Sequence, residues 1–358
     1  MPTSALFELS RRKPTAVGTG LIALDAVMNG DDDPPRLWVG GTCGNVLTIL
    51  SYVGWKSFPL SRLNGDRAAK HVVRDFERWG VRLDFARSNP VVDTPIVVQY
   101  IRKTGAGLPY HRFSWSCPNC GRWFPNYKPI LLRGAEAIIA EIKDPNVFFF
   151  DRASPAALAV ARACAEKGAV VVFEPSGVGN KTFFRQALRV AHILKYSNER
   201  LGNLAETVGS ARVPLEIETL GGDGLRYRSC MSSCDTRGWR RLEAYGANPF
   251  KDAAGAGDWC TAGIIHRLAQ RGMSAFRGTV ESRLVEALKF GQALAAWSCK
   301  FEGARAGMYS VSRAVMRAEV EGIMRGTPRP VALRRKLDVG RAETFKKICE
   351  GCDQGDPR

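Results

Sequence analysis

The feature that most constrains the fold is a set of short, continuously apolar segments that alternate with helical segments. Residues 147–151 (VFFFD), 169–174 (AVVVFE) and 191–195 (AHILK) are such segments, and residues 155–167 between the first two have a helical pattern. A strand that is apolar on both sides is typical of a parallel sheet whose two faces are covered by helices. We therefore expect an α/β fold, a three-layer α/β/α sandwich with a mostly parallel central sheet.

Other elements are expected on both sides of these three strands. Residues 16–25 are expected to form a strand that ends in a carboxylate, that of Asp25. The other elements of the N-terminal third are a small-residue helix that follows a glycine turn (38–50), an amphipathic helix (67–79) and two strands joined by a glycine-rich turn (95–102 and 110–115). Those nearer the C-terminus are a strand (217–220), an antiparallel hairpin (225–228 and 239–244) and three helices (about 256–270, 281–300 and 311–324).

The chain is strongly basic, with 52 Lys and Arg against 35 Asp and Glu and a formal net charge of +17 among 358 residues. Such a field attracts polyanions, and nucleotides, sugar phosphates and nucleic acids all qualify. We favour a solvated basic surface over specific nucleic-acid binding, which the charge alone does not exclude. No run of about 18 apolar residues is present, so we expect no membrane span. The N-terminus lacks the features of a signal peptide, so we expect a cytoplasmic protein.

The segment 252–263 (DAAGAGDWCTAG) carries the strongest chemical signal. Small residues open the backbone before a helix, so the N–H groups of Ala256, Gly257 and Asp258 are expected to point out of the helix end as an anion site. The Asp258 carboxylate beside them can accept a proton from a hydroxyl, while the N–H groups hold the charge of a transferring phosphoryl group. The alternative is a glycine-rich loop whose Asp only caps the helix.

Ten cysteines are present, and six of them form three close pairs. Cys117 and Cys120 lie in a C-P-x-C-G sequence that is typical of a zinc knuckle, in which both thiolates face one ion. A structural zinc site needs four ligands. The candidates for the second pair are Cys349/Cys352, which has the same spacing and is expected first, and Cys230/Cys234. Free thiols or an incidental redox pair are the simpler alternative.

Five ordered motifs resemble those of the ribokinase-like PfkB family of carbohydrate and nucleoside kinases. The run 252–258 resembles the family's DTxGAGD signature. The others are an early glycine motif (40–45), a carboxylate after the first strand (Asp25), a nucleotide loop (219–224) and a late Gly-Ala turn (303–304). Because the motifs spread over residues 17–310, the resemblance implies the family's fold, with a small β-strand lid that closes over the substrate.

The resemblance also implies a role for each matching residue. Asp258 is the catalytic base, and Gly255, Ala256 and Gly257 form the anion hole. The remaining assignments are Asp25, Gly41 and Asn45 for substrate binding and Thr219, Gly221, Gly224, Gly303 and Ala304 for nucleotide binding. Plainer alternatives are turn or helix capping for Asp25 and Asn45 and ordinary strand packing for Thr219. In this fold the hairpin tip with Cys230 and Cys234 should lie far from the lid, which disfavours that pair as zinc ligands.

Two positions depart from the family pattern. The signature's Thr is Ala253 here, which removes one hydroxyl near the phosphates. The family's Asn-x-x-Glu motif, which helps to organise magnesium, is altered, because Asn198 is followed three residues later by Leu201. Glu199 is the residue we expect to do this work from a shifted position, directly or through water. Mg²⁺ is still expected with ATP, because the ion bridges the phosphate charges.

We therefore expect an ATP-dependent kinase that transfers the γ-phosphate to a hydroxyl of a sugar or sugar-like molecule. A nucleoside kinase and a catalytically weak binding protein on a kinase fold are the alternatives. Trp38, Tyr100 and Phe113 could stack on a base or simply pack in the lid, so they do not identify the substrate.

The resemblance also suggests how the chain is divided. The expected parts are an N-terminal tail (1–16), a kinase domain (17–310) with lid strands near 33–41, 95–103 and 110–116, and a C-terminal helix and basic extension with its CxxC pair (311–358). If Cys349 and Cys352 complete the zinc site, the ion would hold this extension against the lid side. If the chain assembles, a homodimer through the lid is the form we expect.

Overall fold

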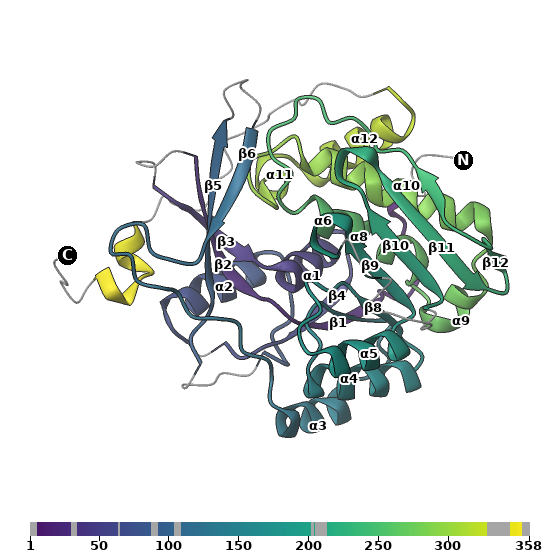
Figure 1. Cartoon of the computed structure of the whole chain (residues 1–358), viewed down its shortest axis with the longest axis horizontal. Helices are drawn as coiled ribbons and strands as arrows, with labels where there is room; N and C mark the ends of the chain where they lie inside the picture. Colours follow the sequence, from purple (N-terminus) through teal and green to yellow (C-terminus); the bar gives the residue numbers. More distant parts are fainter. Residues whose placement is uncertain are drawn as a thin grey trace.

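A nine-stranded sheet forms the centre of the protein (Figure 1). The computed structural model describes residues 6–29, 34–63, 65–86, 92–103, 109–201, 204, 213–327 and 344–352. Along the main path of the sheet the strands follow the order β12-β11-β10-β9-β8-β7-β1-β4, and β13 pairs with β11. Neighbours from β4 to β10 are parallel, whereas β11, β12 and β13 are antiparallel to their partners. The bounds are β1 Thr15–Thr19, β4 Lys56–Leu60, β7 Val147–Phe150, β8 Val170–Phe173, β9 Ile193–Ser197, β10 Leu215–Thr219, β11 Leu225–Met231, β12 Cys234–Asp235 and β13 Arg240–Leu242.

Helices cover both faces of this sheet, because side chains of the parallel strands alternate between two apolar cores. In β7, Val147 and Phe149 belong to one core and Phe148 and Phe150 to the other, and all four are fully buried. The second core is completed by α3 (Leu132–Glu141), α4 (Pro155–Glu166) and α5 (Lys181–Val190). The first is completed by α1 (Thr42–Tyr52), α8 (Ala256–Leu268), α10 (Glu281–Ser298) and α12 (Arg313–Met324). The expected three-layer α/β/α fold with a mostly parallel sheet is therefore confirmed.

A second sheet of four strands, in the order β3-β2-β5-β6, forms the lid. Its strands are β2 Ala23–Met28, β3 Arg36–Gly40, β5 Ile96–Lys103 and β6 Pro109–Ser114. Helix α2 (Arg67–Arg78) begins at Asp66, whose side chain accepts a hydrogen bond from Ala69 N, and it packs against β2 and β3. The glycine-rich turn expected between the last two lid strands lies outside the described residues.

The expected single strand at 16–25 is wrong, because the chain divides there between the two sheets. β1 ends at Thr19 and β2 begins at Ala23. Gly20 between them has φ 146°, and a Cβ at this position would lie 1.6 Å from an oxygen of Asp151, so only glycine fits. Leu21 N then donates to the same carboxylate (2.9 Å). Asp25 consequently belongs to the lid sheet and not to the large sheet.

Both ends of the described chain pack against the body formed by the large sheet and the lid. β1 begins two residues before the expected domain boundary at 17, and Phe7 is buried against Phe290 in the first core. At the other end, two short 3₁₀ helices, η3 (Phe345–Lys347) and η4 (Glu350–Cys352), lie beside the lid side in Figure 1. The part of the basic extension at 328–343 lies outside the described residues.

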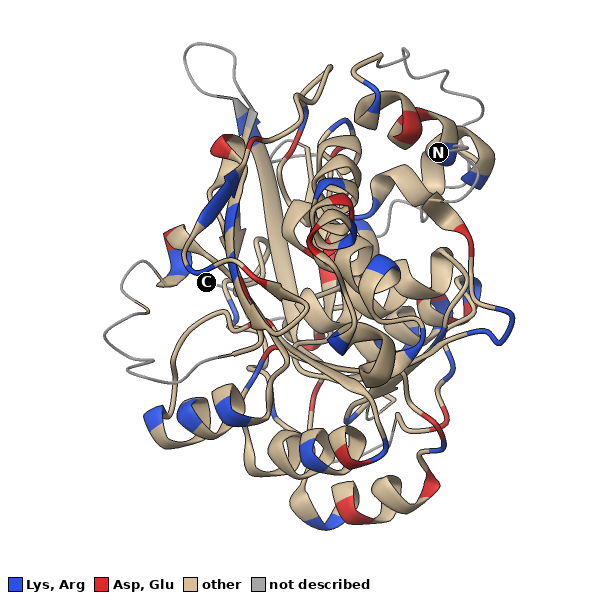
Figure 2. Cartoon of the chain, turned by 90° about the vertical axis from the view of Figure 1, so that its right-hand side faces the viewer, with Lys and Arg blue, Asp and Glu red and all other residues tan. Residues whose placement is uncertain are grey.

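Charged residues are spread over the fold. Figure 2 shows Lys and Arg on helices of both layers and on the lid strands, with Asp and Glu among them. No described helix is long and apolar enough to cross a bilayer.

Candidate active site

The site centres on the N-terminus of α8, where the segment with Asp258 turns into the helix. Gly255 precedes the helix in a left-handed conformation (φ 74°), and a Cβ there would lie 2.5 Å from the Cβ of Ala304. Ala256 N donates to Ala253 O (3.1 Å), so this amide is engaged within the loop. The amides of Gly257 and Asp258 have no acceptor within the described part of the chain. Two of the three expected N–H groups are thus available to bind an anion at a helix N-terminus.

Asp258 lies in the first turn of α8, beside these amides, and its side chain is partly accessible. Its Oδ2 accepts a hydrogen bond from Asn45 Nδ2 (2.7 Å) on α1. Burial, and then the nearby Glu174 carboxylate, raise the pKa of Asp258 to about 7, against the lowering effects of the Asn45 bond, Lys195 and Arg200. A carboxylate with a pKa near neutrality can accept a proton at physiological pH and release it afterwards.

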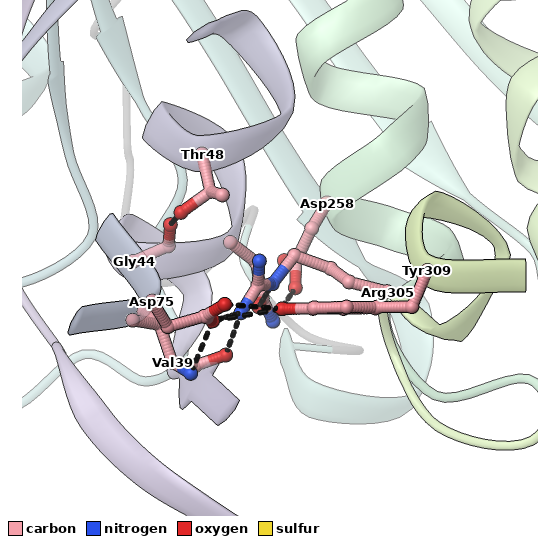
Figure 3. A network of polar contacts seen from close by, with 8 residues as sticks. Val39, Gly44, Thr48, Asp75, Asp258, Arg305 and Tyr309 are labelled. Atoms are coloured by element: carbon pink, nitrogen blue, oxygen red, sulfur yellow. Dashed lines mark hydrogen bonds and ion pairs between the residues drawn. The ribbon is translucent and has the colours of Figure 1, made fainter. Parts of the chain in front are cut away.

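A buried network on the lid side fixes the orientation of Asn45. Arg305, which is fully buried, donates from Nε to Asn45 Oδ1 (3.0 Å) and from Nη2 to Asp75 Oδ2 (2.7 Å). Asp75 also accepts from Tyr309 OH (2.6 Å) and from Val39 N (2.9 Å). Since the Asn45 oxygen faces Arg305, its amide nitrogen must face Asp258. Figure 3 shows Asp258 and Arg305 converging from α8 and from the turn before α11 (Ala306–Ser310).

A second buried network lies on the sheet side of the same helix end. Lys195 lies on β9, and Glu174 directly follows β8. Lys195 Nζ donates to Glu174 Oε1 (2.6 Å) and to Gly257 O (3.2 Å). Thr261, one turn further along α8, donates to Glu174 Oε2 (2.6 Å). Lys195 has an exposed fraction of 2%, so its charge is held by this pairing and not by water. The network anchors the helix end and places one cation and one anion next to Asp258.

The sequence could have indicated this network. Two of the apolar strands expected at the start finish with members of this network, Glu174 and Lys195. The carboxyl ends of parallel strands meet at one edge of an open sheet, where ligands bind. Arg305 and Asp75 carry no comparable signal, because their contacts join residues 230 positions apart.

Asp25, Gly41 and Asn45 were expected to bind the substrate, and they lie around one corner of the fold. Asp25 on β2 stands beside Gly40, where a Cβ would lie 1.8 Å from its carboxyl carbon, so glycine is required for this approach. Gly41 (φ 76°) starts α1, which carries Asn45 in its first turn. Burial raises the pKa of Asp25 to about 7, although the Arg305 charge lowers it. Asp25 and Asn45 therefore both lie near Arg305.

The nucleotide-binding candidates fall into two groups. Thr219 ends β10, and the turn after it requires glycine at Gly221 (φ 60°) and at Gly224, where a Cβ would lie 2.1 Å from Leu242 O. The other group is Gly303 and Ala304. A Cβ on Gly303 would lie 2.5 Å from the Trp38 ring. Ala304 O accepts a hydrogen bond from Trp259 Nε1 (2.9 Å), near the start of α8. The first group surrounds an open turn, and the second supports Gly255.

The magnesium candidates lie on the short helix α6 (Asn198–Leu201), which follows β9. Asn198 Oδ1 is buried and has no hydrogen-bond partner among the described residues. Glu199 is exposed, and its Oε1 lies 4.0 Å from the position of a Cβ on Gly221. Glu199 Oε1 is thus near the turn at 219–224, and both residues offer oxygen, the ligand type that Mg²⁺ prefers.

Asp252, at the start of the DAAGAGD run, links this run to the lid. Its carboxylate accepts from Gln99 Nε2 on β5 (2.7 Å), from Gly303 N (2.8 Å) and from Ala254 N (3.0 Å), and it lies 3.1 Å from His111 Nδ1 on β6. These bonds outweigh burial and hold the pKa of Asp252 below its usual value. Two lid strands are therefore tied to the loop that leads to Asp258.

A small open pocket lies between the lid and the edge strand β4. Ser61 Oγ, Thr94 Oγ1 and Arg62 Nε are buried polar atoms of its lining that have no partner among the described residues. Ile22, also in the lining, packs beside Gly44, the residue before Asn45. The pocket therefore adjoins the elements that carry Asp25 and Asn45 and offers hydrogen bonds to a polar ligand.

The aromatic candidates for stacking on a base are placed differently. Trp38 is buried and stacks on Tyr309 at a ring distance of 5.5 Å, so its ring is part of the core. Phe113 is exposed on β6, and Tyr100 is partly buried against the first core. Tyr127 is the one aromatic side chain among the described residues of the pocket lining.

Cys117, Cys120, Cys349 and Cys352 come together beside the lid, with all four Sγ atoms within 4.8 Å of one another. Cys230 and Cys234 lie on β11 and β12 at the opposite edge of the large sheet.

The layers and the strand order are those of a ribokinase fold, and comparisons with known proteins agree on this. No family model and no curated protein matches the chain. Solved structures match it over most of its length. A fructokinase from Vibrio cholerae O395, described with bound fructose, ADP and calcium, has a TM-score of 0.66 and 17% identity, with 85% of this chain and 98% of that chain covered.

Two further structures show the same likeness with different substrates. A ribokinase from Giardia lamblia has a TM-score of 0.67 at 17% identity, covering 88% of this chain and 99% of that one. A nucleoside kinase from Burkholderia thailandensis in complex with inosine has a TM-score of 0.61 at 17% identity, covering 86% and 97%. At this identity the comparisons establish the fold, and the chemistry must be argued from the site.

Proposed function

We propose that this protein is an ATP-dependent kinase that transfers the γ-phosphate to a hydroxyl of a sugar or sugar-like small molecule. The observation that carries the proposal is the arrangement at the start of α8: a carboxylate with a pKa of about 7 beside two unengaged backbone amides. A base and an anion site within one helical turn are what phosphoryl transfer to a hydroxyl requires.

In this mechanism Asp258 accepts the proton of the attacking hydroxyl. Asn45 holds the carboxylate in place through its amide, and the amides of Gly257 and Asp258 stabilise the negative charge on the transferring phosphoryl group. The ATP phosphates would lie between this helix end and the turn at 219–224. Asn198 and Glu199 would hold the magnesium of MgATP, which neutralises phosphate charge.

The acceptor is proposed to bind at Asp25 and Asn45 and to reach into the adjoining pocket. Its free hydroxyls on Ser61 and Thr94 suit a polyhydroxylated molecule, because each would gain a hydrogen-bond partner. Within the described lining, a purine or pyrimidine would find Tyr127 alone to stack on. A sugar is therefore favoured over a nucleoside, and a nucleoside kinase is the second candidate.

A decisive experiment compares the wild type with Asp258→Asn in a coupled ATP-consumption assay over a panel of sugars and nucleosides. We expect the variant to lose activity by about 10²–10⁴-fold while it still binds an ATP analogue. Asp235→Asn, on exposed β12, is the matched control and should keep full activity. Full activity of Asp258→Asn would overturn the mechanism.

The other class of function is a binding protein on a kinase fold, motivated by the altered Asn-x-x-Glu motif and the net charge of +17. It would show salt-sensitive binding of nucleic acid and no ATP turnover with any acceptor of the panel. The unengaged amides beside Asp258 favour the enzyme.

A homodimer through the lid is proposed on a separate observation. Phe113 lies on β6 and Trp115 directly follows it, and their exposed fractions are 36% and 43%. β6 is an edge strand of the lid sheet. Exposed apolar side chains on an unpaired edge favour pairing with another chain. Light scattering tests this proposal. The wild type is expected to be a dimer, and Phe113→Lys is expected to be a monomer.

A further inference from the structure

The four clustered cysteines have the spacing of a metal site. Cys117 Sγ lies 3.5 Å from Cys352 Sγ, and Cys120 Sγ lies 3.7 Å from Cys349 Sγ. A tetrahedral zinc ion with Zn–S bonds of about 2.3 Å separates its sulfur ligands by about 3.8 Å. A disulfide would bring two sulfurs to about 2.05 Å. The observed distances therefore suit four thiolates around one ion better than two disulfides.

The backbone around Cys117 and Cys120 has the form of a metal knuckle. Gly121 N donates to Cys117 O (2.9 Å), and Gly121 has φ 71°, a conformation that favours glycine. The amides of Asn119 and Cys120 point to the Cys117 sulfur, and the amide of Arg122 points to the Cys120 sulfur. Such N–H groups stabilise negative charge on thiolate ligands. The second pair is turned in a similar way, with Cys352 N donating to Cys349 O (3.2 Å).

The surroundings can also balance the charge of a bound ion. Four thiolates and one Zn²⁺ carry a net charge of about −2. Lys346 and Lys347 lie in η3 beside the second pair, and the Arg122 side chain packs on Gly351, with Cδ 2.8 Å from the position of a Cβ there. Glu350 is the one acidic residue within the described segment 344–352. The site is thus set in a locally basic region.

We propose that Cys117, Cys120, Cys349 and Cys352 bind one structural Zn²⁺, which fastens the C-terminal segment 344–352 to the end of the lid. All four positions are filled by protein ligands, so the ion has no open position for a substrate. Four soft sulfur ligands in a tetrahedral arrangement select zinc or iron, and exclude magnesium and calcium.

The fastening has a structural consequence at both ends. On the C-terminal side, Phe345 and Ile348 are buried in the first core, and Arg67 Nη1 at the start of α2 donates to Lys346 O (3.2 Å). On the lid side, the knuckle is paired to the end of β6 through the bridge between Ser116 and Trp123. Neither the knuckle at 117–121 nor the segment 344–352 contains a long helix or strand that would hold it in place. The ion would therefore cross-link these two segments.

The knuckle also continues directly into the wall of the pocket. Phe124 N donates to Trp115 O (2.8 Å), and the chain then runs through Tyr127, Lys128 and Ile130, which line the pocket. The ion is therefore expected to brace one wall of the proposed acceptor pocket. The metal site itself does not depend on the proposed kinase activity.

Metal analysis of the full-length protein, purified without added metal, tests the proposal. We expect one zinc per chain by inductively coupled plasma mass spectrometry, and less than a tenth of that in the double variant Cys349→Ser/Cys352→Ser. The matched control is Cys230→Ser/Cys234→Ser, which removes a pair at the far edge of the sheet and should keep one zinc. Cobalt substituted for zinc should give the intense visible and near-ultraviolet bands of tetrahedral thiolate coordination.

A further variant separates loss of metal from loss of folding. Cys352→His keeps four zinc-binding ligands, so it should retain zinc if the site is a ligand set. The double variant should also expose the segment 344–352 to protease sooner than the control does. Three results would overturn the proposal: iron in place of zinc, a metal-free wild type in which titration of the unfolded chain finds six free thiols (two disulfides) or all ten, or zinc retained by the double variant.

Discussion

The two sides of Asp258 hold charge in different ways. On the lid side, the Arg305 cation reaches Asp258 only through an amide, because Asn45 accepts from Arg305 and donates to Asp258. On the sheet side, Lys195 and Glu174 form a close ion pair beneath the helix end and act on Asp258 through the electric field. One side is a hydrogen-bonded relay, and the other is a buried pair.

The difference explains how Asp258 can be fixed in direction and still have the raised pKa that its proposed role as a base requires. A direct ion pair with Arg305 would lower the pKa of Asp258 and leave a weak base. The amide of Asn45 fixes the direction of the carboxylate without adding a full positive charge. On the sheet side, Lys195 lowers the pKa and Glu174 raises it, so the pair partly cancels itself. Burial then dominates, and the pKa of Asp258 is about 7.

The largest effect is expected from breaking the lid-side relay. Arg305→Met removes the partner of Asp75 and of Asn45 inside the core. Because it leaves one member of a buried ion pair without its partner, we expect the free energy of unfolding to fall by about 3–5 kcal/mol. Urea unfolding monitored by fluorescence measures it. The control is Arg325→Met, because the Arg325 side chain is about half exposed and pairs with Glu321 one turn away, and a change of less than about 1 kcal/mol is expected there. Equal effects of the two variants would contradict a structural relay.

The next effect concerns stability and pH at Asp258. Its folded-state pKa of about 7 lies above the ordinary value of 3.8, so the folded state favours the neutral carboxyl. Its contribution to stability is complete below about pH 4 and is lost as the pH rises through 7. Asp258→Asn has no carboxylate to ionise. Relative to the wild type, it should therefore gain stability between pH 4 and pH 8, on the order of 2–4 kcal/mol.

Thermal unfolding of both proteins at several pH values measures this gain. Asp25 also has a raised pKa of about 7, but it is present in both proteins and cancels in the comparison. Asp235→Asn serves as the exposed control and should show no pH-dependent gain. A constant difference between Asp258→Asn and the wild type across this range would mean that Asp258 is not held neutral by burial.

A smaller effect is expected from the sheet-side pair. Glu174→Gln removes the charge that raises the pKa of Asp258 and leaves Lys195, which lowers it. The rise of kcat/KM with pH should therefore move to lower pH, and the ratio of activity at pH 6 to that at pH 8 should increase roughly threefold to tenfold. A pH profile of kcat/KM measures this shift. Asn45→Ala, on the relay side, should move the profile the opposite way, because its bond lowers the pKa of Asp258.

These two networks also mark the limit of what the sequence could predict. The strands at 147–151 and 169–174, the helix with Asp258 and both CxxC pairs were found, because each is a local pattern of apolar residues or a short motif. β4 (KSFPL) was missed, since it is a short edge strand that begins with Lys56 and contains Pro59. The division of 16–25 between two sheets depends on Asp151, which is distant in the sequence.

The site was predictable to the same degree. Asp258, Asn45 and Asp25 follow from ordered motifs, and the structure places Asn45 in direct contact with Asp258. Arg305 was not found, because it lies next to the expected Gly-Ala turn but acts through contacts with α1 and α2, more than 200 residues away. Long-range ion pairs leave no periodic trace in a sequence, so they appear only once the chain is folded.

The smallest effect is expected at the link between the lid and the loop before Asp258. His111 Nδ1 on β6 lies 3.1 Å from Asp252 Oδ1, while Gln99, Gly303 and Ala254 also bond to Asp252. Since three partners remain, His111→Ala should remove only one hydrogen bond, worth about 0.5–1.5 kcal/mol. If that bond holds the lid against the loop, the KM of the acceptor should rise about twofold to tenfold while the KM of ATP stays unchanged.

His111→Gln tests whether a hydrogen bond is sufficient, because its amide nitrogen can donate to Asp252 without carrying charge. Restored acceptor affinity in this variant would show that the lid is held by the bond itself. Equal increases in the KM of ATP and of the acceptor would instead mean that the loop, and with it the start of α8, has shifted. The lid would then be a support of the phosphate end as much as a cover for the acceptor.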